Sequence, residues 1–294
     1  MKYGTAAGFR AALLEHLRVE ADRTGTSPEQ LRKRVVFERL LARLFVVAPD
    51  RWTLKGAIGL ALRLRGRIRT TRDVDLLGPH TVDAATEDLI AAQRPELDDY
   101  FNFTIGRAAS PARQRASARF HVTTEIGGIR FDEAVLDVEV QHDETEAPEM
   151  LESHLLAFAD VPAVLIRVVP VELQIADKVH AYTRPHGRDQ TEASTRPKDL
   201  ADLFSIATQL TVDAAKLRQA LRRVFRARRT HPLPASLPAP PRDWGVPFRR
   251  HAAEADLAVG LDEAYAAVAA FLAPVLDDTG RGEWDPVRRV WRSR

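Results

Sequence analysis

The spacing of apolar residues changes near residue 165, and this change limits the possible folds more than any other feature. Before it, short alternating or continuous apolar runs indicate strands lying between helices. After Pro170 the spacing is helical to about residue 228. The sequence therefore predicts an α+β protein with two lobes. A mixed sheet with helices forms the N-lobe over 1–165, and a mainly helical C-lobe covers 166–294.

Turn and cap residues give approximate bounds for the individual elements. Ser27 and Pro28 form an N-cap and first-turn pair that is typical of a helix start. The segment HPLPASLPAPPRDWGVP is expected to run as an extended connector, docked through Trp244 and Val246. We expect helices over 8–22, 28–46, 81–93 and 251–276, and a further helical stretch within 52–64 after a short turn at Gly56. Strands are expected over 69–77, 101–105, 120–125, 134–140 and 161–169.

Composition excludes several classes of protein. The 294 residues contain no cysteine, which removes disulfides, thiolate nucleophiles, iron–sulfur clusters and cysteine zinc sites. No apolar run approaches the roughly 20 residues of a membrane span. Charges also occur too early in the N-terminal segment for a secretory signal. We therefore expect a cytoplasmic protein with no membrane partner.

Two aspartates on one predicted strand suggest a metal site. Asp73 and Asp75 are two residues apart, so strand alternation places both carboxylates on one face. Two adjacent negative charges are costly unless a cation neutralises them. Asp137 could complete a three-carboxylate site for two Mg²⁺ ions, although Glu139 on the same face competes for this role. The alternative is that all of these acids are solvated.

A small-residue turn upstream of the aspartates is a candidate phosphate site. Lys55, Gly56 and Ala57 precede a predicted helical stretch, and the free N–H groups at the start of a helix suit a phosphate. We expect Lys55 and Gly56 to bind nucleotide.

Two charged residues lie on otherwise apolar helix faces. Lys178 shares its helical column with Val171 and Ile175, and Asp199 shares one with Leu203. Burial of such charges demands partners, which could be each other or a ligand. A functional pair and a purely structural pair both remain open at this point. Asp202 lies toward another side of its helix and is expected to be solvated.

A basic amphipathic helix is expected over 216–229. Its arginines, among them Arg222, Arg223 and Arg226, would suit RNA phosphates in a salt-dependent way. All but six of the 43 basic residues are arginine, however, so a solvated surface in an arginine-rich chain is the alternative.

Four ordered motifs resemble the AbiEii toxin nucleotidyltransferases, which include the mycobacterial MenT toxins within the DNA polymerase β-like superfamily. The resemblance covers roughly residues 50–210 and rests on LKGAIGLALRLRGRIRTTRDVDLL, VLDVEV, ELQIADKVHAYTR and TRPKDLADL. It implies a nucleotidyltransferase fold with a helical second lobe and a cognate antitoxin. For the MenT members it implies transfer of nucleotides from NTP to the 3′ end of tRNA.

The resemblance also implies roles for individual residues. Asp73 and Asp75 match the metal-binding acids, and Asp137 is a looser match for a third ligand. The chain departs from the family where it has Gly56-Ala57 in place of Gly-Gly or Gly-Ser. The remaining matches are Lys178 in a Lys-x-x-Ala element, Asp199 in a Lys-Asp element, and Arg69 and Thr71 in the approach to the paired aspartates.

Three functions follow as hypotheses. The first is a toxin that adds nucleotides from NTP to the acceptor end of tRNA and so blocks translation. The second keeps the chemistry but modifies a hydroxyl of a protein or a small molecule. The third is a non-catalytic module that binds RNA or an antitoxin, and the presence of all the motif acids and bases argues against it.

Overall fold

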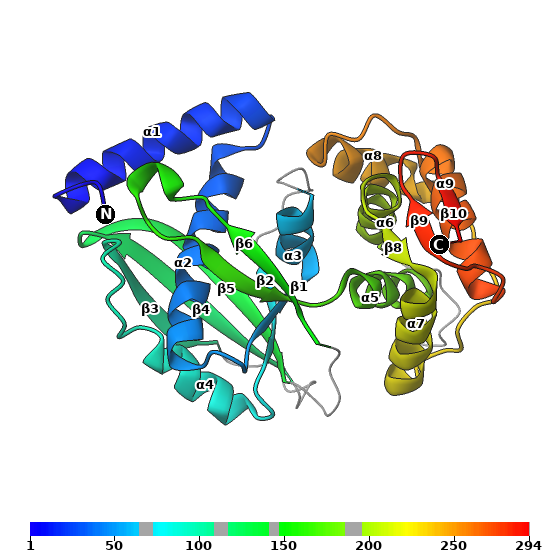
Figure 1. The fold of residues 1–294 in the computed structure, drawn as a ribbon, viewed down its shortest axis with the longest axis horizontal. Helices are drawn as coiled ribbons and strands as arrows, with labels where there is room; N and C mark the ends of the chain where they lie inside the picture. The colour runs from blue at the N-terminus through cyan, green and yellow to red at the C-terminus, as the bar shows by residue number, and fades with distance from the viewer. Residues whose placement is uncertain (65–72, 109–116, 141–146, 186–195, 294) are drawn as a thin grey trace. The chain divides into compact units, whose positions relative to one another are not determined.

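A computed structural model describes residues 1–64, 73–108, 117–140, 147–185 and 196–293 (Figure 1). The chain divides into two compact units, the first ending at Val169 and the second beginning at Pro170. The first contains a seven-stranded mixed sheet with helices, and the second contains mainly helices. The predicted α+β class with a mixed sheet is confirmed.

The sheet of the first unit has the strand order β3-β4-β5-β2-β1-β7-β6 (Figure 1, blue to green). Two pairings are parallel, β2 with β5 and β1 with β7, and the others are antiparallel. The strands are β1 (Thr53–Lys55), β2 (Asp73–Gly78), β3 (Phe101–Arg107), β4 (Ser117–Ile126), β5 (Ile129–Val140), β6 (Glu149–Ser153) and β7 (Val164–Val168). The helices are α1 (Ala6–Thr24), α2 (Pro28–Val47), α3 (Gly56–Arg63) and α4 (Val82–Ala91), with a short 3-10 turn at Ala157–Ala159.

One face of this sheet packs against helices and forms the core. Alternation along β2 buries Val74 and Leu76 among apolar side chains of α1, α2 and α4, and turns Asp73 and Asp75 to the opposite face. Ser27 begins α2 as expected, since its hydroxyl accepts a hydrogen bond from the Gln30 N–H at 3.2 Å. Asp73 and Asp75 therefore lie on the sheet face away from the core.

The second unit is helical with a small three-stranded sheet, which the sequence did not predict (Figure 1, yellow-green to red). Trp291 of its last strand stacks on Phe271 at 5.6 Å between ring centroids. The elements are α5 (Val171–Thr183), α6 (Pro197–Gln209), α7 (Ala214–Arg228), α8 (Gly245–Glu254) and α9 (Leu261–Leu276), with β8 (Val212–Asp213), β9 (Glu283–Asp285), β10 (Val290–Arg292) and a 3-10 turn at Arg242–Trp244.

Several expected elements differ from those observed. Strand β1 precedes the helical stretch expected within 52–64, because residues 53–55 pair between β2 and β7. The helix expected over 251–276 is two helices, separated where Asp256 takes a left-handed φ of 54°. Strand β6 was not predicted. Trp244 is buried as expected, but Val246 is 69% exposed and does not dock.

A buried histidine makes the second unit sensitive to acid. His180 of α5 has 1% of its surface exposed, and its ring contacts the rings of Phe225 and His231. Burial, with the nearby charge of Arg228 and smaller effects of His231 and Arg184, lowers the pKa of His180 from 6.5 to about 4. The ring is therefore neutral in the fold at pH values where the unfolded chain would protonate it.

We expect stability to fall as the pH drops from about 6.5 to about 4, because only the unfolded state gains this proton. The loss attributable to His180 is at most about 3 kcal/mol. Urea unfolding across this pH range should show a shallower loss in His180→Gln, which cannot titrate. His154→Gln, which removes an exposed histidine from the first unit, is the matched control. Equal pH dependence in wild type and His180→Gln would contradict the assignment.

Candidate active site

The parallel pairing of β2 with β5 gathers three of the predicted acids. In this register Asp75 lies directly beside Asp137, and Asp73 lies two residues away on the same face of β2. Neighbouring strands are about 4.8 Å apart, so the side chains of Asp75 and Asp137 are immediate neighbours. Glu139 follows on the same face of β5, beside Leu77. Asp137 is thus better placed than Glu139 to join the paired aspartates.

Two cations flank these carboxylates in the same row of the sheet. Lys55 of β1 pairs in register with Asp75, and Arg119 of β4 pairs with Asp137. The guanidinium of Arg119 donates two hydrogen bonds to the Asp137 carboxylate, at 2.7 and 2.9 Å. The Lys55 ammonium donates to the carboxylate of Glu139. Four adjacent strands therefore place a cation, two carboxylates and a second cation side by side.

The charges of this row affect one another's protonation. The hydrogen bond and charge of Asp137 raise the pKa of Arg119, and the charge of Asp73 adds to the effect. The side chains gathered on this face include two bases, Lys55 and Arg119. They also include four acids: Asp73, Asp75, Asp137 and Glu139. The formal excess of two negative charges, carried by hard oxygen donors, fits a divalent cation. Among the described residues, no group of three or more acidic or histidine side chains is arranged to hold a metal ion as the structure stands.

Gly56 is required by the close approach of Asp75. It begins α3 with φ of 68°, and a Cβ at this position would collide with the Asp75 carboxylate. The sequence predicted that the N–H groups of this turn would meet a phosphate, and the structure places the Asp75 carboxylate against Gly56. Arg69 and Thr71, expected to bind nucleotide, lie outside the described residues.

Lys178 and Asp199 lie in the second unit within a group of four charged side chains. Lys178 has 9% of its side chain exposed and donates to Asp202 at 2.5 Å, whereas its ammonium is 3.7 Å from Asp199. Asp199 lies in the first turn of α6, where the helix dipole favours an acid, and its other oxygen is 2.7 Å from Arg196. The ammonium is therefore closer to Asp202 than to the acid that the sequence singled out.

The expectation that Asp202 is solvated was wrong. Its residue is 3% exposed, as is Asp199. Residues three apart on a helix are neighbours on its surface, so the spacing from Asp199 could have revealed that Asp202 also turns toward α5. The position of Arg119 beside Asp137 was not predicted, because the strand expected over 120–125 began one residue too late to include Arg119, while β4 begins at Ser117.

The predicted RNA face on α7 is partly engaged within the protein. Arg222 donates two hydrogen bonds to Asp278, at 2.7 and 2.9 Å, and Arg223 is half-buried. Arg226 is exposed. These three residues therefore differ in how much charge they present to solvent.

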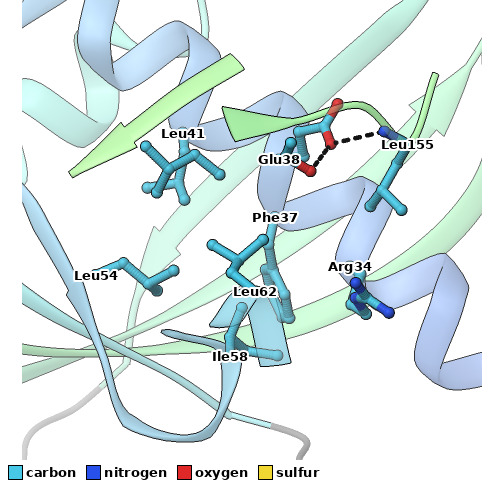
Figure 2. A pocket seen from close by; sticks show the side chains of 10 residues that line it. Arg34, Phe37, Glu38, Leu41, Leu54, Ile58, Leu62 and Leu155 are labelled. Carbon is cyan, nitrogen blue, oxygen red and sulfur yellow. Dashed lines mark hydrogen bonds between the residues drawn. The ribbon is translucent and has the colours of Figure 1, made fainter. Parts of the chain in front are cut away.

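A small pocket of the first unit is lined by residues of α2, α3, β1, β6 and β7, and none of the candidate site acids lines it (Figure 2). Glu38 and Arg34 are its charged members, and Leu54 and Ile58 are among the apolar side chains that line it. Burial raises the pKa of Glu38, whose carboxylate accepts hydrogen bonds from the Ser153 hydroxyl and the Leu155 N–H. The space admits no more than about one water molecule, which excludes a nucleotide.

Comparison with known proteins identifies the class of this chain. The family described as nucleotidyl transferase AbiEii toxin, type IV toxin–antitoxin system, matches residues 39–286. The nucleotidyltransferase toxin MenT4 from Mycobacterium tuberculosis has a TM-score of 0.53 and 18% identity, over 92% of this chain and 97% of its own. JHP933 from Helicobacter pylori has a TM-score of 0.45 and 15% identity, over 84% and 92%. No curated protein matches.

The fold and the family match define a nucleotidyltransferase. The chain belongs to the AbiEii family of toxin nucleotidyltransferases, which confirms the resemblance seen in its motifs. A type IV toxin–antitoxin family implies a nucleotide substrate and an antitoxin partner. None of the helices in the described ranges is both long and apolar enough to span a bilayer.

The charged group around Lys178 predicts unequal effects of its two acids. Asp202→Asn removes the closest partner of a buried ammonium and should cost about 3–5 kcal/mol of unfolding free energy. Asp199→Asn should cost clearly less, because Lys178 keeps Asp202 and Arg196 is 41% exposed to water. Urea unfolding of both variants measures the order.

A double variant separates a charge effect from a packing effect. Lys178→Met combined with Asp202→Leu removes both charges of the closest pair, while Asp199 keeps Arg196, and should recover most of the stability that Asp202→Asn loses. An Asp199→Asn variant as unstable as Asp202→Asn would contradict the assignment of Asp202 as the main partner of Lys178.

Proposed function

We propose that this toxin transfers nucleotides from NTP to the 3′ acceptor end of tRNA in a Mg²⁺-dependent reaction, and so blocks translation. The observation that carries the metal assignment is the register of β2 and β5, which sets Asp75 beside Asp137 with Asp73 on the same face. The membership of a toxin nucleotidyltransferase family supports the type of reaction.

In the proposed reaction, the 3′ hydroxyl oxygen of the acceptor attacks the α-phosphorus of the NTP. The bond between this phosphorus and the β-phosphate oxygen breaks, and pyrophosphate leaves. A bound divalent metal would activate the hydroxyl and neutralise charge on the leaving group. We assign Asp73, Asp75 and Asp137 as its ligands, two ions being the expected number. Glu139 holds Lys55 in place through their ion pair.

The remaining roles rest on the residue chemistry and the family motifs. Lys178 is assigned to neutralise triphosphate charge, which an ammonium does well at short range. Asp199 positions or deprotonates the hydroxyl, or orients Lys178. Lys55 and Gly56, with Arg69 and Thr71, are assigned to the nucleotide. The antitoxin is expected to be a protein, and the toxin to act in the cytoplasm.

Incubation with Mg²⁺, each labelled NTP and total RNA tests the proposal. Label on RNA of tRNA length, removable by digestion from the 3′ end, is the expected result. Label on protein or on a small molecule would favour the alternative acceptors, and absence of any label would favour a non-catalytic module. Asp75→Asn should abolish labelling while the protein stays folded, because removing one carboxylate relieves repulsion in a crowded site. Near-normal labelling by this variant would refute the metal assignment.

Three arginines of α7 are proposed to bind the RNA backbone. Replacement of Arg222, Arg223 and Arg226 by glutamine should weaken tRNA binding and lower the slope of log K against log salt. Each phosphate that is no longer bound should lower this slope by somewhat under one unit. Arg226 alone should account for more of this change than Arg222, which already binds Asp278.

Titration of tRNA binding at several salt concentrations measures these slopes. Arg18→Gln is the matched control for Arg226→Gln, because each removes one positive charge from an exposed arginine and Arg18 lies on α1 in the first unit. A triple variant with the slope of the control would show that this helix is a solvated surface.

A further inference from the structure

The Arg119–Asp137 ion pair occupies a carboxylate that the proposed reaction needs. Asp137 presents both of its oxygens to the guanidinium, so a metal ion would compete with Arg119 for the negative charge and lone pairs of this carboxylate. Resting on the proposed function, we propose that Arg119 is an exchangeable counter-ion. It neutralises Asp137 before metal binds, and it transfers to a phosphate of the nucleotide when metal takes the carboxylate.

The exposure of this pair allows the exchange. The side chains of Arg119 and Asp137 are 51% and 34% exposed, and ion pairs open to water contribute at most about 1 kcal/mol. By contrast, Arg43 and Asp99 in the same unit form a pair with 2% and 1% exposure. Breaking that buried pair would leave charges stranded in the core. Of these two pairs, only the exposed one can open without disturbing the fold.

The chemistry of arginine suits the second partner. Its planar donors bind the two oxygens of a phosphate in the same bidentate manner as those of a carboxylate. Arg119 also lies at the end of a row that continues through Asp137 to Asp75, the proposed metal ligands. A nucleotide whose phosphates are bound by that metal would therefore bring anionic oxygens close to the released guanidinium. Metal binding and nucleotide binding should then favour each other through this one side chain.

The exchange predicts opposite effects of one substitution on two ligands. Arg119→Gln removes a competitor for Asp137, so the affinity for Mn²⁺ alone should rise about two- to fivefold. The same variant should bind α,β-methylene NTP analogues at saturating Mn²⁺ about tenfold more weakly, since glutamine cannot supply the charge-assisted hydrogen bonds of the guanidinium. Calorimetry on the full chain measures both affinities, and the methylene bridge prevents transfer.

Controls separate this inference from the proposed function. Arg130→Gln removes an arginine of β5 that pairs with Glu133, outside the acidic row, and should change neither affinity. In an Asp137→Asn background, Arg119→Gln should no longer tighten Mn²⁺ binding. If Asp75→Asn binds Mn²⁺ as wild type does, the metal site is wrong and the inference falls with it. If Asp75→Asn loses Mn²⁺ but Arg119→Gln matches Arg130→Gln, or weakens both ligands, only the exchange is wrong.

Discussion

The parallel pairing of β2 with β5 is the constraint on which the acidic site depends. The two strands are separated in sequence by α4, β3 and β4, yet their register sets Asp75 beside Asp137. A slip of one residue would turn Asp137 into the core and bring an apolar neighbour to the site, because side chains alternate along a strand. The apolar residues Leu136 and Val138, both buried, hold the register by packing on the other face.

Bringing carboxylates together creates repulsion that the neighbouring strands offset. Lys55 and Arg119 lie at the two ends of the row, so the fold carries its own cations next to its acids. In the second unit cations also lie next to acids, but the group is more buried. Lys178 contacts Asp202, and Arg196 lies against Asp199. Exposure is the difference between them. The exposed pair of the first group is therefore the cheaper one to open, whereas removing a partner from the buried second group is expected to cost more stability.

The family match and the structural comparison carry different information. The family model covers residues 39–286 and so includes both acidic strands and both charged helices. The likeness to MenT4 extends over 92% of the chain at only 18% identity, and it shows the fold alone. Side-chain contacts such as Arg119 with Asp137 are properties of this chain's own structure, which neither the family match nor the fold likeness specifies.

The sequence by itself determined what depends on local periodicity. Strand alternation placed Asp73 and Asp75 on one face, and the helical repeat turned Lys178 and Asp199 inward. Only the tertiary structure decided which acid each cation meets, as when Lys178 lies closer to Asp202. It alone also set Asp137 next to Asp75 and gave Asp137 the guanidinium of Arg119. The physical reason is that strand order, register and side-chain pairing arise from contacts between residues distant in sequence, which no local pattern encodes.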